Sequence, residues 1–136
     1  MKALLDTNIF LEIILSQERA GEAKSLLLKS ASHEFFITDY SLHSIGLLLF
    51  RRNQHEAFRA FLEDILLNGG VGLLTLLPDE METMIASSQN FRLDFDDAYQ
   101  YAVAISRDAV LVSFDTDFQR TDRGYKTPLE ILQSMT

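Results

Sequence analysis

KALLDTN, residues 2–8, is a short apolar run that ends in a carboxylate and an amide. An apolar run without polar alternation predicts a strand that is buried on both faces of a parallel sheet. In open α/β sheets, functional groups collect at the carboxyl ends of such strands. We therefore expect a first strand that delivers Asp6 to a functional edge of the sheet.

Two later stretches carry acids in comparable positions. AVLVS, residues 109–113, predicts another buried strand, and Asp115 and Asp117 follow it directly. DFDDA, residues 94–98, opens a helical pattern, so a third acidic cluster lies at the start of a helix. We expect these three clusters to converge at the same edge.

The rest of the chain alternates helical and strand patterns. Helices are expected at residues 9–15, about 18–29, about 39–51, 55–66, 78 to about 87, 95–105 and 127–132, and further strands at 35–37, 71–77 and 109–113. This alternation predicts one α/β domain over residues 1–136, with a mostly parallel sheet that helices cover on both sides.

Composition narrows the chemistry that this chain can perform. Its 136 residues suffice for one domain with a real core, and it contains no cysteine, so any metal must bind oxygen or imidazole. No apolar run approaches membrane-spanning length, and the N-terminus does not resemble a signal peptide. We expect a cytoplasmic protein without a membrane partner.

The net charge of −8 argues against binding nucleic acid through a broadly basic surface. Three interpretations stay open. The acids solubilise the surface, they attract a basic partner, or they gather in a pocket where a divalent cation neutralises them. Gathered carboxylates select hard cations such as Mg²⁺ or Mn²⁺, and these ions activate water and stabilise charge during phosphodiester hydrolysis.

The individual acids have competing structural roles. Asp6 could cap the following helix, but a carboxylate directly after a buried strand is costly to place without a function, so we interpret it as a ligand. Asn8 is equally compatible with a turn and with a site role. Asp94 is better explained as a helix cap and Asp96 as a solvated first-turn acid, which leaves Asp97 as the expected ligand.

The remaining candidate residues come after the last predicted strand or after the second predicted strand. Asp115 occupies a position equivalent to that of Asp6, whereas Asp117 is either a further ligand or a turn former. His43 is interpreted mainly as a partly buried, hydrogen-bonded histidine, with a role in the site as the alternative.

These motifs resemble those of a PIN domain, the metal-dependent nuclease fold of VapC-type toxins. The resemblance covers nearly the whole chain and rests on LLDTN at residues 4–8, on Asp97-Ala98 with the alanines that follow, on VSFDTDF at 112–118 and on TPLE at 127–130. It implies a three-layer α/β/α sandwich with a central, mostly parallel sheet.

The resemblance also implies an activity and partners. Asp6, Asp97 and Asp115, helped by Asp117, would bind Mg²⁺ or Mn²⁺ and cleave RNA, while Asn8 and Ser113 match positions that support the site. An antitoxin protein and a homodimer are the expected partners. Arg51 and Arg52 are candidate cations for guiding the RNA.

One position departs from the family pattern. A glutamate is usual on the helix after the second strand, but residues 38–45 contain none, and Ser44 or His43 falls where it is expected. Asp39, one turn earlier, either compensates or caps the helix. A PIN module without efficient catalysis, which binds RNA or protein, is therefore the alternative function.

A haloacid dehalogenase-type phosphatase is a third hypothesis, prompted by the pair Asp115 and Asp117. It fits poorly, because that family carries its paired aspartates on the first strand.

Overall fold

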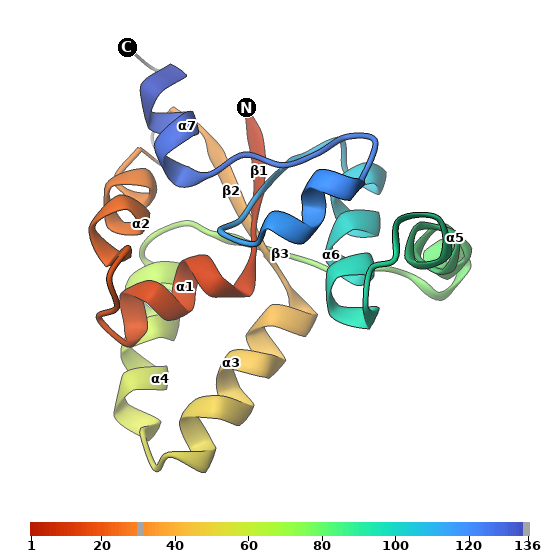
Figure 1. Ribbon diagram of the computed structural model, residues 1–136. Helices are drawn as coiled ribbons and strands as arrows, with labels where there is room; N and C mark the ends of the chain where they lie inside the picture. Colours follow the sequence, from red (N-terminus) through yellow and green to blue (C-terminus); the bar gives the residue numbers. More distant parts are fainter. Residues whose placement is uncertain (30–31, 135–136) are drawn as a thin grey trace.

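The computed structural model describes residues 1–29 and 32–134 (Figure 1). Within these residues, four strands form one sheet: β1 (Lys2–Leu5), β2 (Glu34–Thr38), β3 (Gly72–Leu74) and β4 (Val110–Val112). Their order is β3-β2-β1-β4, and every neighbouring pair is parallel. The predicted α/β class and parallel sheet are confirmed.

Helices surround this sheet. The α-helices are α1 (Thr7–Ile14), α2 (Ala20–Leu27), α3 (Asp39–Arg51), α4 (His55–Phe61), α5 (Met81–Phe91), α6 (Phe95–Ser106) and α7 (Pro128–Ser134). In the described part of the chain, no helix combines the length and the apolar character that a membrane span requires.

Alternating side chains of β1 face two separate cores, as expected for a strand that is buried on both faces. Ala3 and Leu5 pack with α1, α2, α3 and α4, whereas Leu4 packs with residues of α5 and α6. Figure 1 shows these two groups of helices on opposite sides of the sheet. The result is the predicted three-layer α/β/α sandwich.

The strand order places a switch point beside β1. The chain passes from β1 to β2 and β3 on one side, and then returns to add β4 on the other side. The backbone N–H of Asp6 donates to the carbonyl oxygen of Val112 at 2.9 Å, so the carboxyl ends of β1 and β4 lie together. Such a switch point is where open α/β sheets bind ligands.

The third strand is shorter than the apolar run at residues 71–77 predicts. β3 ends at Leu74, which pairs with Thr38, the last residue of its neighbour β2, and beyond this point the Leu76 N–H donates to the hydroxyl of Tyr99 at 3.0 Å. A 3₁₀ turn, η2 (Pro78–Glu80), then precedes α5, which continues past the predicted end near residue 87 to Phe91.

Two other segments differ from the sequence pattern. The helix expected over residues 55–66 divides into α4 and a π-helical segment, η1 (Leu62–Leu67), in which the N–H of Asn68 reaches back to the carbonyl of Glu63. A short 3₁₀ helix that the sequence did not indicate, η3 (Thr116–Arg120), follows β4.

Candidate functional site

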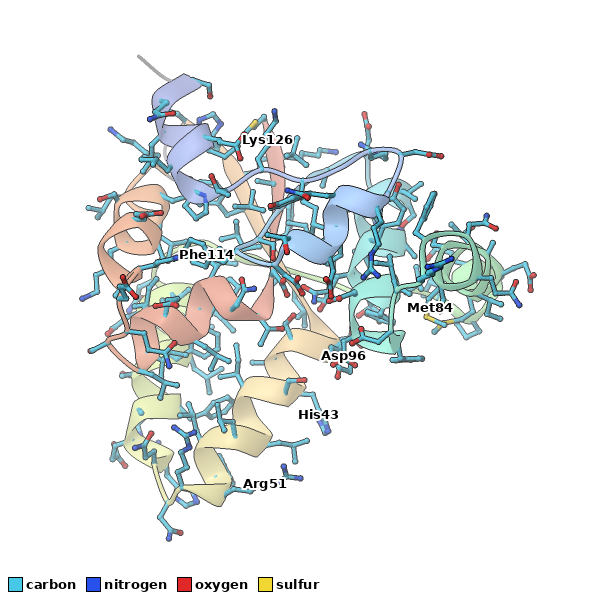
Figure 2. All side chains as sticks on the ribbon, in the orientation of Figure 1. His43, Arg51, Met84, Asp96, Phe114 and Lys126 are labelled. Carbon is cyan, nitrogen blue, oxygen red and sulfur yellow. The ribbon has the colours of Figure 1, made fainter. Side chains whose placement is uncertain are left out.

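The ends of β1 and β4 and the start of α6 bring the predicted acids to one edge of the sheet. Asp6 follows β1, Asp97 lies in the first turn of α6, and Asp115 caps η3 after β4. These three carboxylates line one pocket of about 240 Å³. Figure 2 shows neighbouring Asp96 where α6 begins, next to the start of α3.

Three of the acids come close enough to share a cation. One carboxylate oxygen from each of Asp97, Asp115 and Asp117 lies within 4.8 Å of the other two. Asp97 is buried, Asp115 is half-buried and Asp117 is exposed, with an ion pair to Arg120 at 3.4 Å. Oxygen donors at this spacing fit a hard divalent ion such as Mg²⁺ or Mn²⁺.

Burial and crowding make Asp97 difficult to ionise. Loss of solvent, together with the negative charges of Asp94, Asp6, Asp115 and Asp117, raises the pKa of Asp97 to about 7. A divalent cation among these carboxylates would reverse this repulsion, so the electrostatics of the cluster also fit a metal.

Asp6 lies outside this set of three and is held by hydrogen bonds. Its Oδ1 accepts from the Thr7 N–H and from Gln100 Nε2, both at 2.7 Å, and its Oδ2 accepts from Ser113 Oγ at 2.6 Å. Only 5% of its surface is exposed. Burial raises the pKa of Asp6, and the three hydrogen bonds partly oppose that increase.

Ser113 and Asn8 connect the two strand ends beside the acids. Asn8 Nδ2 donates to Ser113 Oγ at 3.3 Å, and Asn8 Oδ1 accepts from the Phe114 N–H at 3.3 Å. Ser113 Oγ also accepts from the Asp115 N–H at 2.8 Å. The two side chains therefore fix Asp6 and Asp115 relative to each other, which suits the supporting role that the resemblance implied.

Gln100 and Ser41 are components that sequence reasoning missed. Gln100 is only 2% exposed, and its Oε1 accepts from Ser41 Oγ at 3.3 Å while its Nε2 holds Asp6. Ser41 is also bonded to Thr7 Oγ1 at 2.7 Å. A signal for Gln100 existed, because it lies one turn after Asp97 as the polar residue of an apolar helical stretch, where a buried amide needs partners.

The structure separates the three candidates for the missing glutamate. Ser44 lines the acidic pocket, whereas His43 lines a different, apolar groove formed by residues of α3 and α4. His43 is exposed, so the expectation that it is partly buried is wrong. Asp39 accepts a hydrogen bond from the Tyr99 hydroxyl at 2.7 Å and does not line the pocket.

Arg51 and Arg52 lie away from the acids. Both are exposed, and Arg51 ends α3 while the pocket-lining residues are near the start of that helix (Figure 2). At 1.5 Å per residue, the 13 residues of α3 separate its two ends by about 18 Å. The structure therefore does not bring these cations to the acidic pocket.

Comparisons with known proteins agree with this arrangement. The model of the family described as PIN domain matches residues 3–124, while no curated protein matches the chain. A toxin–antitoxin complex from Klebsiella pneumoniae contains a chain with 25% identity and a TM-score of 0.72, with 93% of this chain and 97% of that chain covered.

Two further solved structures share the fold at lower identity. VapBC2 from Rickettsia felis, bound to a promoter DNA fragment, has 14% identity and a TM-score of 0.73, with 93% of this chain and 97% of that chain covered. VapC20 from Mycobacterium tuberculosis, described as a sarcin–ricin loop cleaving toxin, has 24% identity and a TM-score of 0.68, with 86% and 92% covered.

Proposed function

Because this chain belongs to the PIN domain family, we propose that it is a metal-dependent endoribonuclease and the toxin of a toxin–antitoxin pair. The observation that carries this proposal is the set of three carboxylates, Asp97, Asp115 and Asp117, whose oxygens lie within 4.8 Å of one another. They lie at the carboxyl edge of the sheet, beside buried Asp6.

In this proposal, Asp97, Asp115 and Asp117 hold Mg²⁺ or Mn²⁺. When bound, such an ion lowers the pKa of a coordinated water and stabilises the charge that develops on a phosphate. Asp6, fixed by Gln100 and Ser113, lines the same pocket and is proposed as a further ligand of this ion. Because its pKa is raised to about 7, Asp97 is about half protonated near neutral pH, and binding of the ion would favour its ionised form.

The proposed partners follow from the relatives. The chain from Klebsiella pneumoniae belongs to a toxin–antitoxin complex, which supports an antitoxin partner for this protein. We also infer a homodimer of single-domain, cytoplasmic chains. Size-exclusion chromatography with light scattering tests the dimer, and a strict monomer at high concentration would argue against it.

Cleavage of a mixed RNA pool tests the catalytic proposal. The purified chain is incubated with Mn²⁺, with Mg²⁺ and with chelator, beside Asp97→Asn and Asp115→Asn. Asp79→Asn, an exposed acid in η2, is the matched control for a contaminating nuclease. We expect metal-dependent cleavage by the wild type and the control, and a loss of at least about a hundredfold in both site variants.

The alternative function is a binding module without efficient catalysis. The observation that favours it is Ser44, which lines the pocket where a fourth carboxylate would strengthen the hold on a metal. Equal inactivity of the wild type and both site variants, together with metal-independent folding, would support this alternative.

A further inference from the structure

Three aromatic rings lie together beside the acidic pocket, where the first turns of α3 and α6 meet. The ring centroid of Phe95 is 6.2 Å from that of Tyr40 and 6.2 Å from that of Tyr99, and Tyr40 and Tyr99 are 5.9 Å apart. The planes of Phe95 and Tyr99 are inclined by only 25°, so these two rings are stacked. We refer to Tyr40, Phe95 and Tyr99 as the aromatic rim.

The aromatic rim is continuous with the site. Tyr40 lines the same pocket as Asp6, Asp97 and Asp115. Burial, together with the neighbouring carboxylate of Asp96, raises the pKa of Tyr40. A molecule that enters the acidic pocket therefore lies beside Tyr40, the member of the aromatic rim that lines the pocket.

The rim is held in place from behind. Tyr99 is only 6% exposed, its hydroxyl donates to Asp39 at 2.7 Å, and the same oxygen accepts from the Leu76 N–H at 3.0 Å. This anchored ring supports Phe95 on one side. A preorganised aromatic surface loses little conformational entropy when a ligand binds to it.

Phe95 is the member of the rim that solvent reaches. It is 56% exposed, and it lies between Asp94 and Asp96 in a turn where acids are otherwise favoured. Contact with the two tyrosines leaves more than half of its surface available for a further ring. A nucleobase face carries no net charge, so stacking on Phe95 is not opposed by Asp94 and Asp96 as a phosphate contact would be.

We propose that Phe95, supported by Tyr40 and Tyr99, is a stacking platform for an unpaired nucleobase next to the phosphate held at the acidic pocket. This inference rests on the proposed function and names its substrate class: single-stranded RNA, or a loop whose bases are free. A paired base inside a duplex cannot offer its face to Phe95, whereas an unpaired base can stack on an aromatic side chain.

Binding of short labelled oligonucleotides tests this platform separately from cleavage. Affinity is measured by fluorescence anisotropy in Ca²⁺, with the integrity of the RNA checked after each titration. The probes are a single-stranded RNA, the duplex of the same sequence and the matching single-stranded DNA. The variants are Phe95→Ala, Phe95→Leu and Phe95→Tyr, with Phe50→Ala as a control, because Phe50 is 51% exposed on the far part of α3.

We expect Phe95→Ala to weaken single-stranded binding by about five- to a hundredfold, the loss of one stacked base. Phe95→Leu should lose nearly as much, because it keeps the apolar volume but not the aromatic face, while Phe95→Tyr and Phe50→Ala should bind like the wild type. Duplex binding should be weaker and indifferent to Phe95. If Phe95→Ala weakens the binding of single-stranded RNA and DNA equally, Phe95 contacts the base. If it weakens the binding of RNA alone, Phe95 also contacts the ribose.

Several outcomes would overturn the inference. Unchanged single-stranded binding by Phe95→Ala would do so even if the wild type cleaves RNA, and so would a wild type that binds neither single strand. If the protein cleaves no RNA but binds single strands in a way that depends on Phe95, the stacking platform is supported and the proposed catalysis is wrong.

Discussion

Ser44 and His43 are adjacent in the sequence, yet their side chains reach different surfaces of the protein. Successive residues of an α-helix are separated by about 100° around its axis, because one turn takes 3.6 residues. Ser44 therefore lines the acidic pocket, while His43 lines the apolar groove between α3 and α4. This difference provides a matched pair of positions for adding a carboxylate.

Ser44→Glu should bind Mn²⁺ at least about tenfold more tightly than the wild type, because the number of charged ligands sets the affinity of a carboxylate site. Isothermal titration calorimetry measures the affinity. His43→Glu adds the same charge to the same helix outside the pocket, and it should leave the affinity nearly unchanged. Equal gains in both variants would mean that general electrostatics, rather than a ligand at residue 44, strengthens binding.

Gln100 is predicted to stabilise the fold through Asp6. Gln100→Leu keeps a similar volume but removes the donor 2.7 Å from Asp6 Oδ1, so a buried carboxylate loses a partner. We expect the free energy of unfolding at pH 8 to fall by about 1–3 kcal/mol, measured by urea denaturation. Gln89→Leu, at an exposed position of α5, is the control and should change it by less than about 0.5 kcal/mol.

At the residue scale, the sequence was informative where a polar group ends an apolar run. Asp6 and Asp115 follow buried strands, and this local pattern predicted that they would share a pocket, as they do. Ser113, 107 residues from Asp6, was expected near the site only from the family resemblance, and Gln100, 94 residues away, was missed because no local pattern links it to Asp6. Only the tertiary structure shows that both oxygens of Asp6 are already hydrogen-bonded.

Helix starts are the elements from which this site is built. α1 begins directly after Asp6, α6 begins directly after Asp94, and the Thr38 side chain caps α3 by accepting from the Ser41 N–H at 3.0 Å. The positive end of a helix dipole favours nearby carboxylates by up to about 1 kcal/mol each. This contribution reduces the repulsion among the gathered acids but, at Asp97, does not cancel it.

The raised pKa of Asp97, in the first turn of α6, predicts how stability depends on pH. Its pKa rises from 3.8 to about 7 on folding, so the folded protein binds this proton more tightly than the unfolded chain. The resulting stabilisation is complete below pH 3.8 and is lost as the pH rises toward and through about 7. Burial also raises the pKa of Asp6, so Asp6 contributes a pH dependence of stability with the same sign.

Urea denaturation of metal-free protein from about pH 5 to pH 8 measures this dependence. Wild-type stability should decline over that range, whereas Asp97→Asn, which cannot ionise, should lose much of the decline and be the more stable protein at pH 8. Addition of Mn²⁺ at pH 8 should stabilise the wild type and have much less effect on the variant. A wild type that gains stability with pH would contradict the assignment.

The helices and strands with a strong hydrophobic periodicity were predicted well, but the residues at which some of them end were not. The predicted Asp94 cap of α6 is confirmed by the hydrogen bond from the Asp97 N–H at 3.0 Å. β3 is short because its distant partner β2 ends at Thr38, opposite Leu74, so the apolar residues beyond Leu74 have no strand to pair with in the described part of the chain. The switch of α4 into a π-helical segment has no local pattern that we could identify.

At the scale of the whole molecule, the sheet order explains why distant acids meet. Placing β4 beside β1, and not beside β3, brings residues near the two ends of the chain to the same edge. This order does not follow from composition. It also concentrates negative charge at the pocket, so the proposed RNA substrate would need a metal there and favourable contacts elsewhere on the surface.

Arg51 and Arg52 are the cations predicted to supply such contacts. Because they lie about 18 Å from the start of α3, only an RNA long enough to extend along that helix can reach them from the pocket. Replacing both by glutamate should therefore weaken binding of a long single-stranded RNA and leave a short oligonucleotide that covers only the pocket unaffected. The binding constant K should also depend less on salt. The slope of log K against log salt concentration should become shallower by about 0.7 for each phosphate that the variant no longer binds.

Fluorescence anisotropy at several salt concentrations measures both quantities. Lys24→Glu with Lys29→Glu is the matched control, because it also replaces two exposed cations by two anions and changes the net charge equally. Arg51 lies in the last turn of α3, where reversal of its charge costs up to about 1 kcal/mol of stability, so folding is verified first. Equal losses in both double variants would show that only net charge matters, and unchanged binding of the long RNA at low salt would remove Arg51 and Arg52 from its path.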